Sequence, residues 1–147
     1  MDKIFKVNWK IATVIYILAA LFCTGMGMGA PFFNIALGAL VGWWAAGRAE
    51  RLSLKARDVL RRILLISGLT AGFTLLVMVT IWVPMFAMLW DANADLANFG
   101  IPMILYDPLW SFLGWQVLMI FISPFLQLLM SIFGGFMYLL YWHSTKD

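Results

Sequence analysis

The chain has 147 residues, of which 64% are hydrophobic and 12% are charged, and its formal net charge is +3. Soluble domains contain about 25% charged residues, so half that proportion leaves too few charges to cover a surface in water. The composition excludes an ordinary soluble domain and predicts a single all-α integral membrane domain over residues 1–147. The single cysteine, Cys23, excludes an intrachain disulfide and a thiolate metal cluster within one chain.

The first predicted membrane span covers residues 8–26, with Trp9 as an anchor at the membrane interface. Lysines precede its apolar run, as they do in a cleaved signal peptide, but the best cleavage position has Ala30 followed by Pro31. A lipoprotein signal at Cys23 is disfavoured by the bulky residue before it. We therefore expect a retained helix that ends in a glycine-rich turn.

The second predicted span covers residues 31–47 and starts at Pro31, which suits the first turn of a helix. Residues 48–62 follow as a predicted basic loop. A short loop held between two membrane spans is poorly able to enter a groove of DNA or RNA, so we expect no nucleic-acid partner. The positive-inside rule instead predicts a cytoplasmic loop that contacts anionic lipid headgroups. The basic side chains are Arg48, Arg51, Lys55, Arg57, Arg61 and Arg62.

The third predicted span covers residues 63–90, and an acidic outer loop follows at residues 91–107. All ten basic residues lie in the N-terminal tail, in residues 48–62 or near the C-terminus. Four crossings bring these three segments to one side, which predicts that both termini are cytoplasmic in a plasma or inner membrane. The loop aspartates, which could bind a divalent cation but more simply are solvated, are Asp91, Asp95 and Asp107.

The fourth predicted span, residues 109–142, is too long for a simple crossing. A helix of this length measures about 50 Å, whereas the hydrocarbon core is about 30 Å thick. Asp107 and Pro108 form a good helix start. We expect one long helix in an antiparallel bundle of four, kinked at Pro124. The alternative is a re-entrant pair of half-helices.

A polar stripe favours the kinked helix. At 100° per residue, its members fall within about 60° of one another, and this register continues through Pro124. The members are Gln116, Ile120, Ser123, Gln127, Ser131, Gly134 and Tyr138. The other spans have weaker lines of small or polar residues, which are Thr13, Ala20, Thr24 and Gly27, then Asn34, Gly38, Ala45 and Arg48, and finally Ser67, Ala71, Thr74 and Met78.

These lines have two interpretations. Small residues allow helices to approach closely, and buried amides form hydrogen bonds between helices. Alternatively, Asn34, Gln116 and Gln127 line a polar cavity or a conduction path. Glycines four residues apart add two candidate helix contacts, within the chain or between chains, and these are Gly38 with Gly42 and Gly68 with Gly72.

Sulfur side chains gather towards the predicted outer side, where soft ligands would suit Cu(I). Methionine is also an ordinary gap filler, so we favour no metal site and expect no cofactor. The weak candidates are Cys23, Met26, Met28, Met85, Met88 and Met103. The only histidine, His143, is predicted at the opposite face from Cys23, so the two cannot form a catalytic pair within one chain.

No Asp, Glu, Lys or Arg lies in the middle of a predicted span, which disfavours proton-coupled carriers. No catalytic residues are predicted. The leading hypothesis is a non-catalytic membrane protein that acts through helix association, with its own copies or with other membrane subunits. The alternatives are a small homo-oligomeric channel or transporter for an ion or a neutral or lipidic solute, and an outer-side protein that binds copper or a divalent cation.

Overall fold

A computed structural model describes residues 5, 7–26, 31–52, 55–98 and 102–144, and this part of the chain is helical without strands. Three helical stretches are long and apolar enough to cross a membrane, namely Trp9–Met26, Ala56–Trp90 and Pro108–Ser144. The elements in chain order are α1 (Trp9–Met26), α2 (Phe32–Arg51), α3 (Ala56–Trp82), the 3₁₀ helix η2 (Val83–Trp90), α4 (Pro108–Val117), the π-helical turn η3 (Leu118–Ile122) and α5 (Ser123–Ser144).

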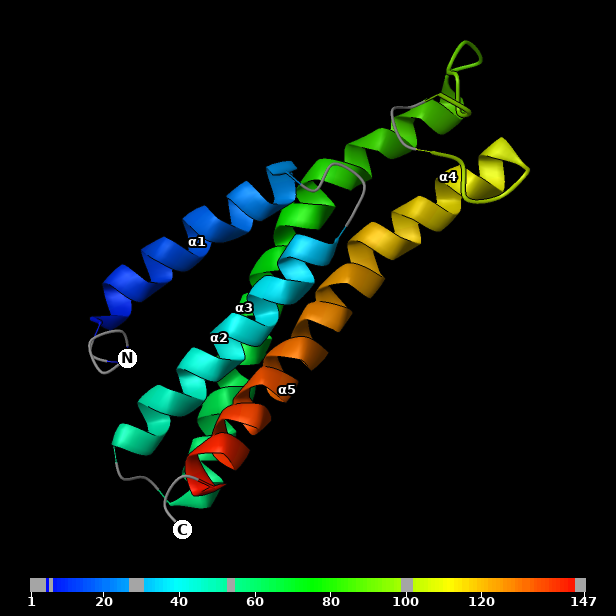
Figure 1. Ribbon diagram of the computed structural model, residues 1–147. Helices are drawn as coiled ribbons and strands as arrows, with labels where there is room; N and C mark the ends of the chain where they lie inside the picture. Colours follow the sequence, from blue (N-terminus) through cyan, green and yellow to red (C-terminus); the bar gives the residue numbers. More distant parts are fainter. Residues whose placement is uncertain (1–4, 6, 27–30, 53–54, 99–101, 145–147) are drawn as a thin grey trace.

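Successive long helices run in opposite directions, so α2 and α5 run parallel to each other (Figure 1). The start of α1, the end of α2, the start of α3 and the end of α5 lie together at one end, which we call the basic end. At the other end, α3 with η2 and α4 extend beyond α1 and α2. We call the described part of this extension that contains η2 and α4, residues 83–98 and 102–117, the outer arm, after the side on which the sequence predicts it.

Glycines set the close approach of α2 to α5. A Cβ atom added to Gly38 would lie 2.5 Å from the carbonyl oxygen of Gln127, and one added to Gly42 would overlap the carbonyl oxygen of Ser131. On α5, a Cβ atom on Gly134 would overlap the backbone of α2 at Ala39. The two backbones therefore touch directly, as small residues permit in membrane helices.

The second glycine pair behaves differently. A Cβ atom on Gly68 or Gly72 of α3 would meet nothing within 4 Å. These two glycines make no close helix contact within the described chain.

The predicted basic loop at residues 48–62 is wrong in its extent. α2 continues to Arg51 and α3 already begins at Ala56, so residues 48–51 and 56–62 are helical. Alanine, arginine, leucine and glutamate in these segments all form helices well. These charged residues therefore lie on helical turns and do not end the helices.

The predicted third span, residues 63–90, changes its helical type near the end. α3 becomes the 3₁₀ helix η2 at Val83, immediately before Pro84. Proline lacks an N–H group and its ring clashes with the carbonyl group four residues earlier, so the regular α-helix stops here.

The last segment is helical without interruption from Pro108 to Ser144, so the re-entrant pair of half-helices does not form. Its predicted start is confirmed, because the Asp107 carboxylate accepts a hydrogen bond of 3.0 Å from the backbone N–H of Trp110. Close to the position of the predicted kink, Pro124, the helix contains the π-helical turn η3, just before the proline. A wider turn relieves the clash between the proline ring and the preceding carbonyl groups.

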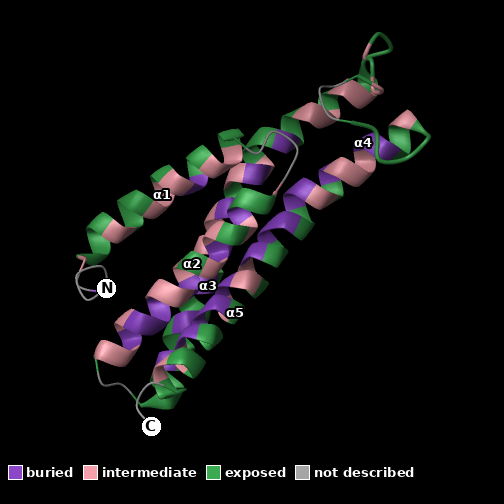
Figure 2. Cartoon of the chain, viewed as in Figure 1, coloured by how far each residue is buried: buried purple, intermediate pink, exposed green. Residues whose placement is uncertain are grey.

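Two apolar clusters fill the two ends of the interior. At the basic end, the cluster contains Phe5, Ala46, Ala49, Val59, Ile63 and Tyr138, and towards the outer arm a second cluster contains Met78, Trp82, Met119 and Ile120. Buried residues lie on α2, α3 and α5, whereas α1 is mostly exposed (Figure 2). Ala20 is the buried residue of α1.

Candidate functional site

A column of buried polar side chains follows the inner face of the last helical segment from Gln116 to Ser131, and Met119 and Ile120 of the second apolar cluster lie within this stretch. Gln116, Ser123, Gln127 and Ser131 of the predicted stripe are each at most 1% exposed, and Asn34 of α2 is 2% exposed. The stripe therefore faces the interior of the chain, towards neighbouring helices, and not the outer surface. Ile120, Gly134 and Tyr138 share this buried face.

Between the middle of the column and the basic end, two buried hydroxyl groups are each other's hydrogen-bond partner. The hydroxyl groups of Ser67 on α3 and Ser131 on α5 form a hydrogen bond of 2.7 Å. Both side chains are fully buried, and this bond joins the two helices. A hydroxyl group buried without a partner costs about 1–3 kcal/mol, so each serine stabilises the burial of the other.

Tyr16 of α1 joins three helices at the middle of the column. Its hydroxyl group donates to the carbonyl oxygen of Thr70 at 2.8 Å, and it accepts from the side-chain amide of Gln127 at 3.0 Å. The hydroxyl group of Thr74 lies 3.2 Å away. These bonds fix the otherwise exposed α1 against α3 and α5.

Tyr16 was not among the residues predicted from the sequence, although the signal was present. Tyr16 lies three residues after Thr13 and four before Ala20, so it belongs to the small-or-polar line predicted on α1. Tyr16 was left out of that line because the line was defined by small side chains and tyrosine is large.

Towards the outer arm, the column contains polar atoms without hydrogen-bond partners in the described chain. These atoms are Asn34 Oδ1, both amide atoms of Gln116, Ser123 Oγ and Gln127 Oε1. Asn34 uses only its Nδ2 group, which donates to the hydroxyl group of Thr24 at 3.1 Å. Buried polar atoms of this kind are normally paired with ordered water or a polar ligand.

The chemistry available to the column is hydrogen bonding. The buried polar side chains in the described part of the chain are amides and hydroxyls. Amide and aliphatic hydroxyl groups do not change charge in the physiological pH range, so they can hold water or a neutral polar group but are poorly suited to relay protons.

The predicted basic side chains divide into two groups. Arg48 donates hydrogen bonds to the carbonyl oxygens of Phe5 and Val7 and stacks on Trp44 at 5.5 Å, and the Arg51 guanidinium lies 4.9 Å from the centre of the Phe5 ring. These two arginines therefore hold the N-terminal segment. The exposed members are Lys55, Arg57, Arg61 and Arg62.

The predicted sulfur ligands lie on separate elements. Cys23 is half-buried on α1, Met85 and Met88 belong to η2, and Met28 lies outside the described residues. Met26 and Met103 are exposed. Within the described ranges, no group of three or more His, Cys, Asp or Glu side chains is placed to hold a metal ion.

The outer aspartates have local structural roles. Asp91 accepts a hydrogen bond from the backbone of Asn93, and Asp95 accepts from the backbone of Ala97 and the side chain of Asn98. The amide of Asn98 and the N–H group of Ala97 lower the pKa of the exposed Asp95 carboxyl group. These bonds shape the loop turns.

Comparison with known proteins adds no family to this description. No protein-family model, curated protein or solved structure matches the chain.

Proposed function

We propose that this chain is a non-catalytic integral membrane protein that acts through helix association, as a subunit or accessory of a larger membrane assembly. In this proposal α2 is a fourth crossing beside the three long apolar stretches, and the basic end faces the cytoplasm. The observation that supports it most is the outer arm, which extends beyond α1 and α2.

The length of the last segment supports a projecting arm. Pro108–Ser144 contains 37 residues, which as a helix measure about 55 Å. Fitting this length into a hydrocarbon core of about 30 Å would require a tilt of about 57°, whereas membrane helices tilt by about 0–40°. Part of the arm therefore lies beyond the hydrocarbon core.

The outer arm has exposed apolar and aromatic side chains in the region that, in this proposal, lies beyond the hydrocarbon core and borders water. Trp90 is 81% exposed, Trp110 is 62% exposed, and Tyr106 is fully exposed. Removing apolar surface from water gains about 25 cal/mol per Å². Contact with a partner protein at the outer membrane surface would therefore be favourable, whereas within lipid the same side chains would gain little.

A site-specific photo-crosslinker tests this surface. We would place it at Trp110 and, as a matched control, at Leu18 of α1, which is also 62% exposed. We expect one product of defined mass from the Trp110 position, either a dimer of the chain or a complex with one other subunit, and none from Leu18. A chain that is monomeric by native mass spectrometry and gives no product at Trp110 would contradict the proposal.

A second candidate function is a small channel or carrier, and the unpartnered polar atoms of the column favour it. Gln116, Ser123 and Asn34 would then contact water or a neutral solute. In reconstituted liposomes, solute flux that falls on Gln116→Leu substitution would support this function. The Leu126→Ala variant, altered at a partly exposed position, serves as control. The absence of any flux of ions or small solutes in these liposomes would exclude the channel or carrier function.

A further inference from the structure

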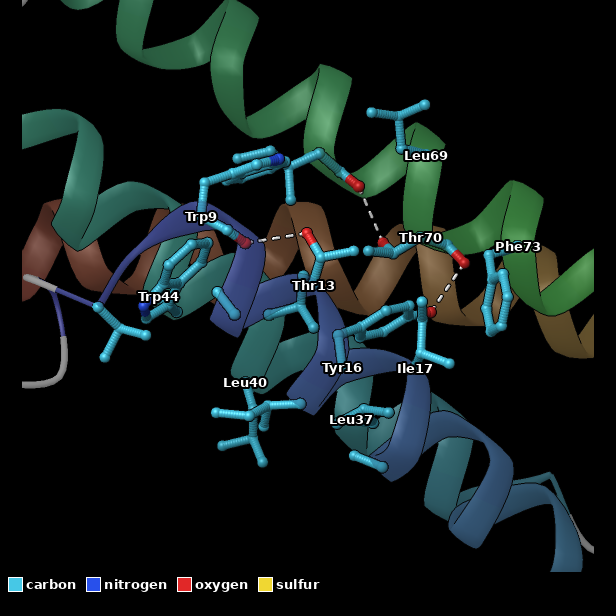
Figure 3. A pocket seen from close by; sticks show the side chains of 16 residues that line it. Trp9, Thr13, Tyr16, Ile17, Leu37, Leu40, Trp44, Leu69, Thr70 and Phe73 are labelled. Carbon is cyan, nitrogen blue, oxygen red and sulfur yellow. Dashed lines mark hydrogen bonds between the residues drawn. The ribbon is translucent and has the colours of Figure 1, made fainter.

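An apolar groove separates α1 from α2 and α3. Its volume is about 470 Å³, within the range of about 300–1,000 Å³ that is usual for small-molecule sites. Figure 3 shows the side chains that line it from the three helices. They include Ala12 of α1, Leu37, Leu40 and Trp44 of α2, and Leu69 and Phe73 of α3.

The groove has the length of one membrane leaflet. On α1 its lining runs from Trp9 to Ala19, which corresponds to about 15 Å along a helix axis. Half of a hydrocarbon core of about 30 Å is also about 15 Å. α1 itself belongs to the stretches that are apolar enough to cross a membrane. The groove therefore suits a chain that lies parallel to the helices within one leaflet.

A fixed polar contact keeps the groove from closing. Tyr16 lines it and is bonded to the carbonyl oxygen of Thr70, which also lines it (Figure 3). This contact sets the separation between α1 and α3 at the middle of the membrane. The remaining walls are aliphatic or aromatic, so a ligand gains contact area there and few hydrogen bonds.

Positive charge marks the basic end of the groove. Arg48 stacks on Trp44 and donates to the carbonyl oxygen of Val7, and both of these residues line the groove. Two carbonyl oxygens accept hydrogen bonds from its Nη1 group, and a carbonyl oxygen has no formal charge that would neutralise the guanidinium. Lys10 does not line the groove itself, but it is exposed in the first turn of α1 and so adds a second cation at this end.

We propose that the groove binds an anionic phospholipid, with one acyl chain between α1 and the α2–α3 pair and the phosphate group near Arg48 and Lys10. This proposal rests on the membrane crossing proposed above. The Trp9 and Trp44 rings, whose centroids are 6.0 Å apart, stand at the same end, at the level where tryptophans prefer the membrane interface. An uncharged hydrophobic ligand would fill the groove but leave these cations without a counter-charge.

Native mass spectrometry of the full chain in mild detergent tests the proposal. The probes are dioleoyl phosphatidylglycerol and dioleoyl phosphatidylcholine, which share acyl chains and differ in net charge. We expect the anionic lipid to bind at about tenfold lower concentration, a difference that corresponds to about 1.4 kcal/mol. Equal binding of both lipids by the unaltered chain would overturn the proposal.

Variants separate the groove from the headgroup site. Ala12→Trp fills the groove and should abolish retention of both lipids, whereas Val14→Trp, at an exposed position outside the groove, should not. Arg48→Gln should remove the preference for the anionic lipid, and Arg48→Lys should retain most of it. If Ala12→Trp does not fold, as judged by circular dichroism, Ala19→Phe provides a second groove-filling substitution.

Three outcomes would overturn the assignment. Retention unchanged by a folded groove-filling variant would mean that the lipid binds elsewhere. Loss of binding in Val14→Trp as well would indicate general lipid contact with α1. Displacement of the lipid by inorganic phosphate would indicate a phosphate site without an acyl chain. The same spectra report the oligomeric state, so failure of lipid binding and failure of helix association remain distinguishable.

Discussion

The contact between α2 and α5 predicts that Gly42→Ala strongly destabilises the fold. A Cβ atom at this position would overlap the carbonyl oxygen of Ser131 and lie 2.6 Å from its carbonyl carbon and 2.9 Å from the backbone nitrogen of Gly135. All three atoms belong to the backbone of α5. No side chain can rotate to make room, so the two helices must move apart.

The expected magnitude follows from two opposing effects. Adding a methyl group to a well-packed interior costs about 1–3 kcal/mol, and contact with backbone places this site near the upper value. Alanine is favoured over glycine in a helix by about 1 kcal/mol. The net loss of stability is therefore about 2 kcal/mol.

Gly68→Ala is the matched control, because the added Cβ atom meets nothing within 4 Å. The same propensity difference then acts without opposition, so stability should stay constant or rise by up to about 1 kcal/mol. The two variants make the same chemical change on two helices, and the expected difference between them is about 3 kcal/mol.

Unfolding by sodium dodecyl sulfate in mixed micelles, followed by tryptophan fluorescence, measures this difference. Gly135→Ala should show a smaller loss than Gly42→Ala, because the closest atom to its Cβ, at 2.9 Å, belongs to the side chain of Ile63, and the nearest backbone atom, the Gly42 carbonyl oxygen, lies 3.3 Å away. It also provides a measurable variant if Gly42→Ala cannot be purified in a folded state. If Gly42→Ala proves as stable as Gly68→Ala, the direct backbone contact between α2 and α5 does not exist.

Three further predictions concern individual polar groups. Ser67→Ala and Ser131→Ala should each lower the free energy of unfolding by about 1–3 kcal/mol, and the double variant should lose less than the sum of the two; additive losses would argue against the hydrogen bond. Tyr16→Phe should loosen α1 and increase amide hydrogen exchange there, and unchanged protection would show that packing alone fixes this helix. The lowered pKa of Asp95 should move towards its ordinary value of 3.8 in Asn98→Ala. Because that pKa is lower in the folded loop, the loop bonds should persist above the ordinary pKa and weaken as pH falls through the folded value, which a carbon-13 NMR titration would detect.

Much of the last helix followed from spacing alone. The stripe from Gln116 to Tyr138 was predicted by its helical period, and its members share the buried face. The proline at 124 also indicated where the helix would be irregular. Its form, a π-helical turn, depends on how neighbouring helices hold the backbone, and a single sequence does not contain that information.

The contacts between helices were harder to predict from the sequence than the helices themselves. Gly42 and Gly68 belong to pairs with the same spacing, yet only the pair on α2 meets another backbone. Spacing places residues on a face but does not say which face meets which. The role of Arg48 was likewise hidden, because its partners Phe5 and Val7 lie more than 40 positions away in the sequence.

The central position of α2 has a consequence for biosynthesis. α2 is not among the stretches that are apolar enough to cross a membrane alone, and its closest backbone contacts are made with α5, which leaves the ribosome after α3 and the outer arm. During translation, α2 therefore waits without its main neighbour while α3 and the outer arm are made. We expect premature stop codons before Ser123 to leave α2 poorly inserted, so that quality-control proteases remove the truncated chain.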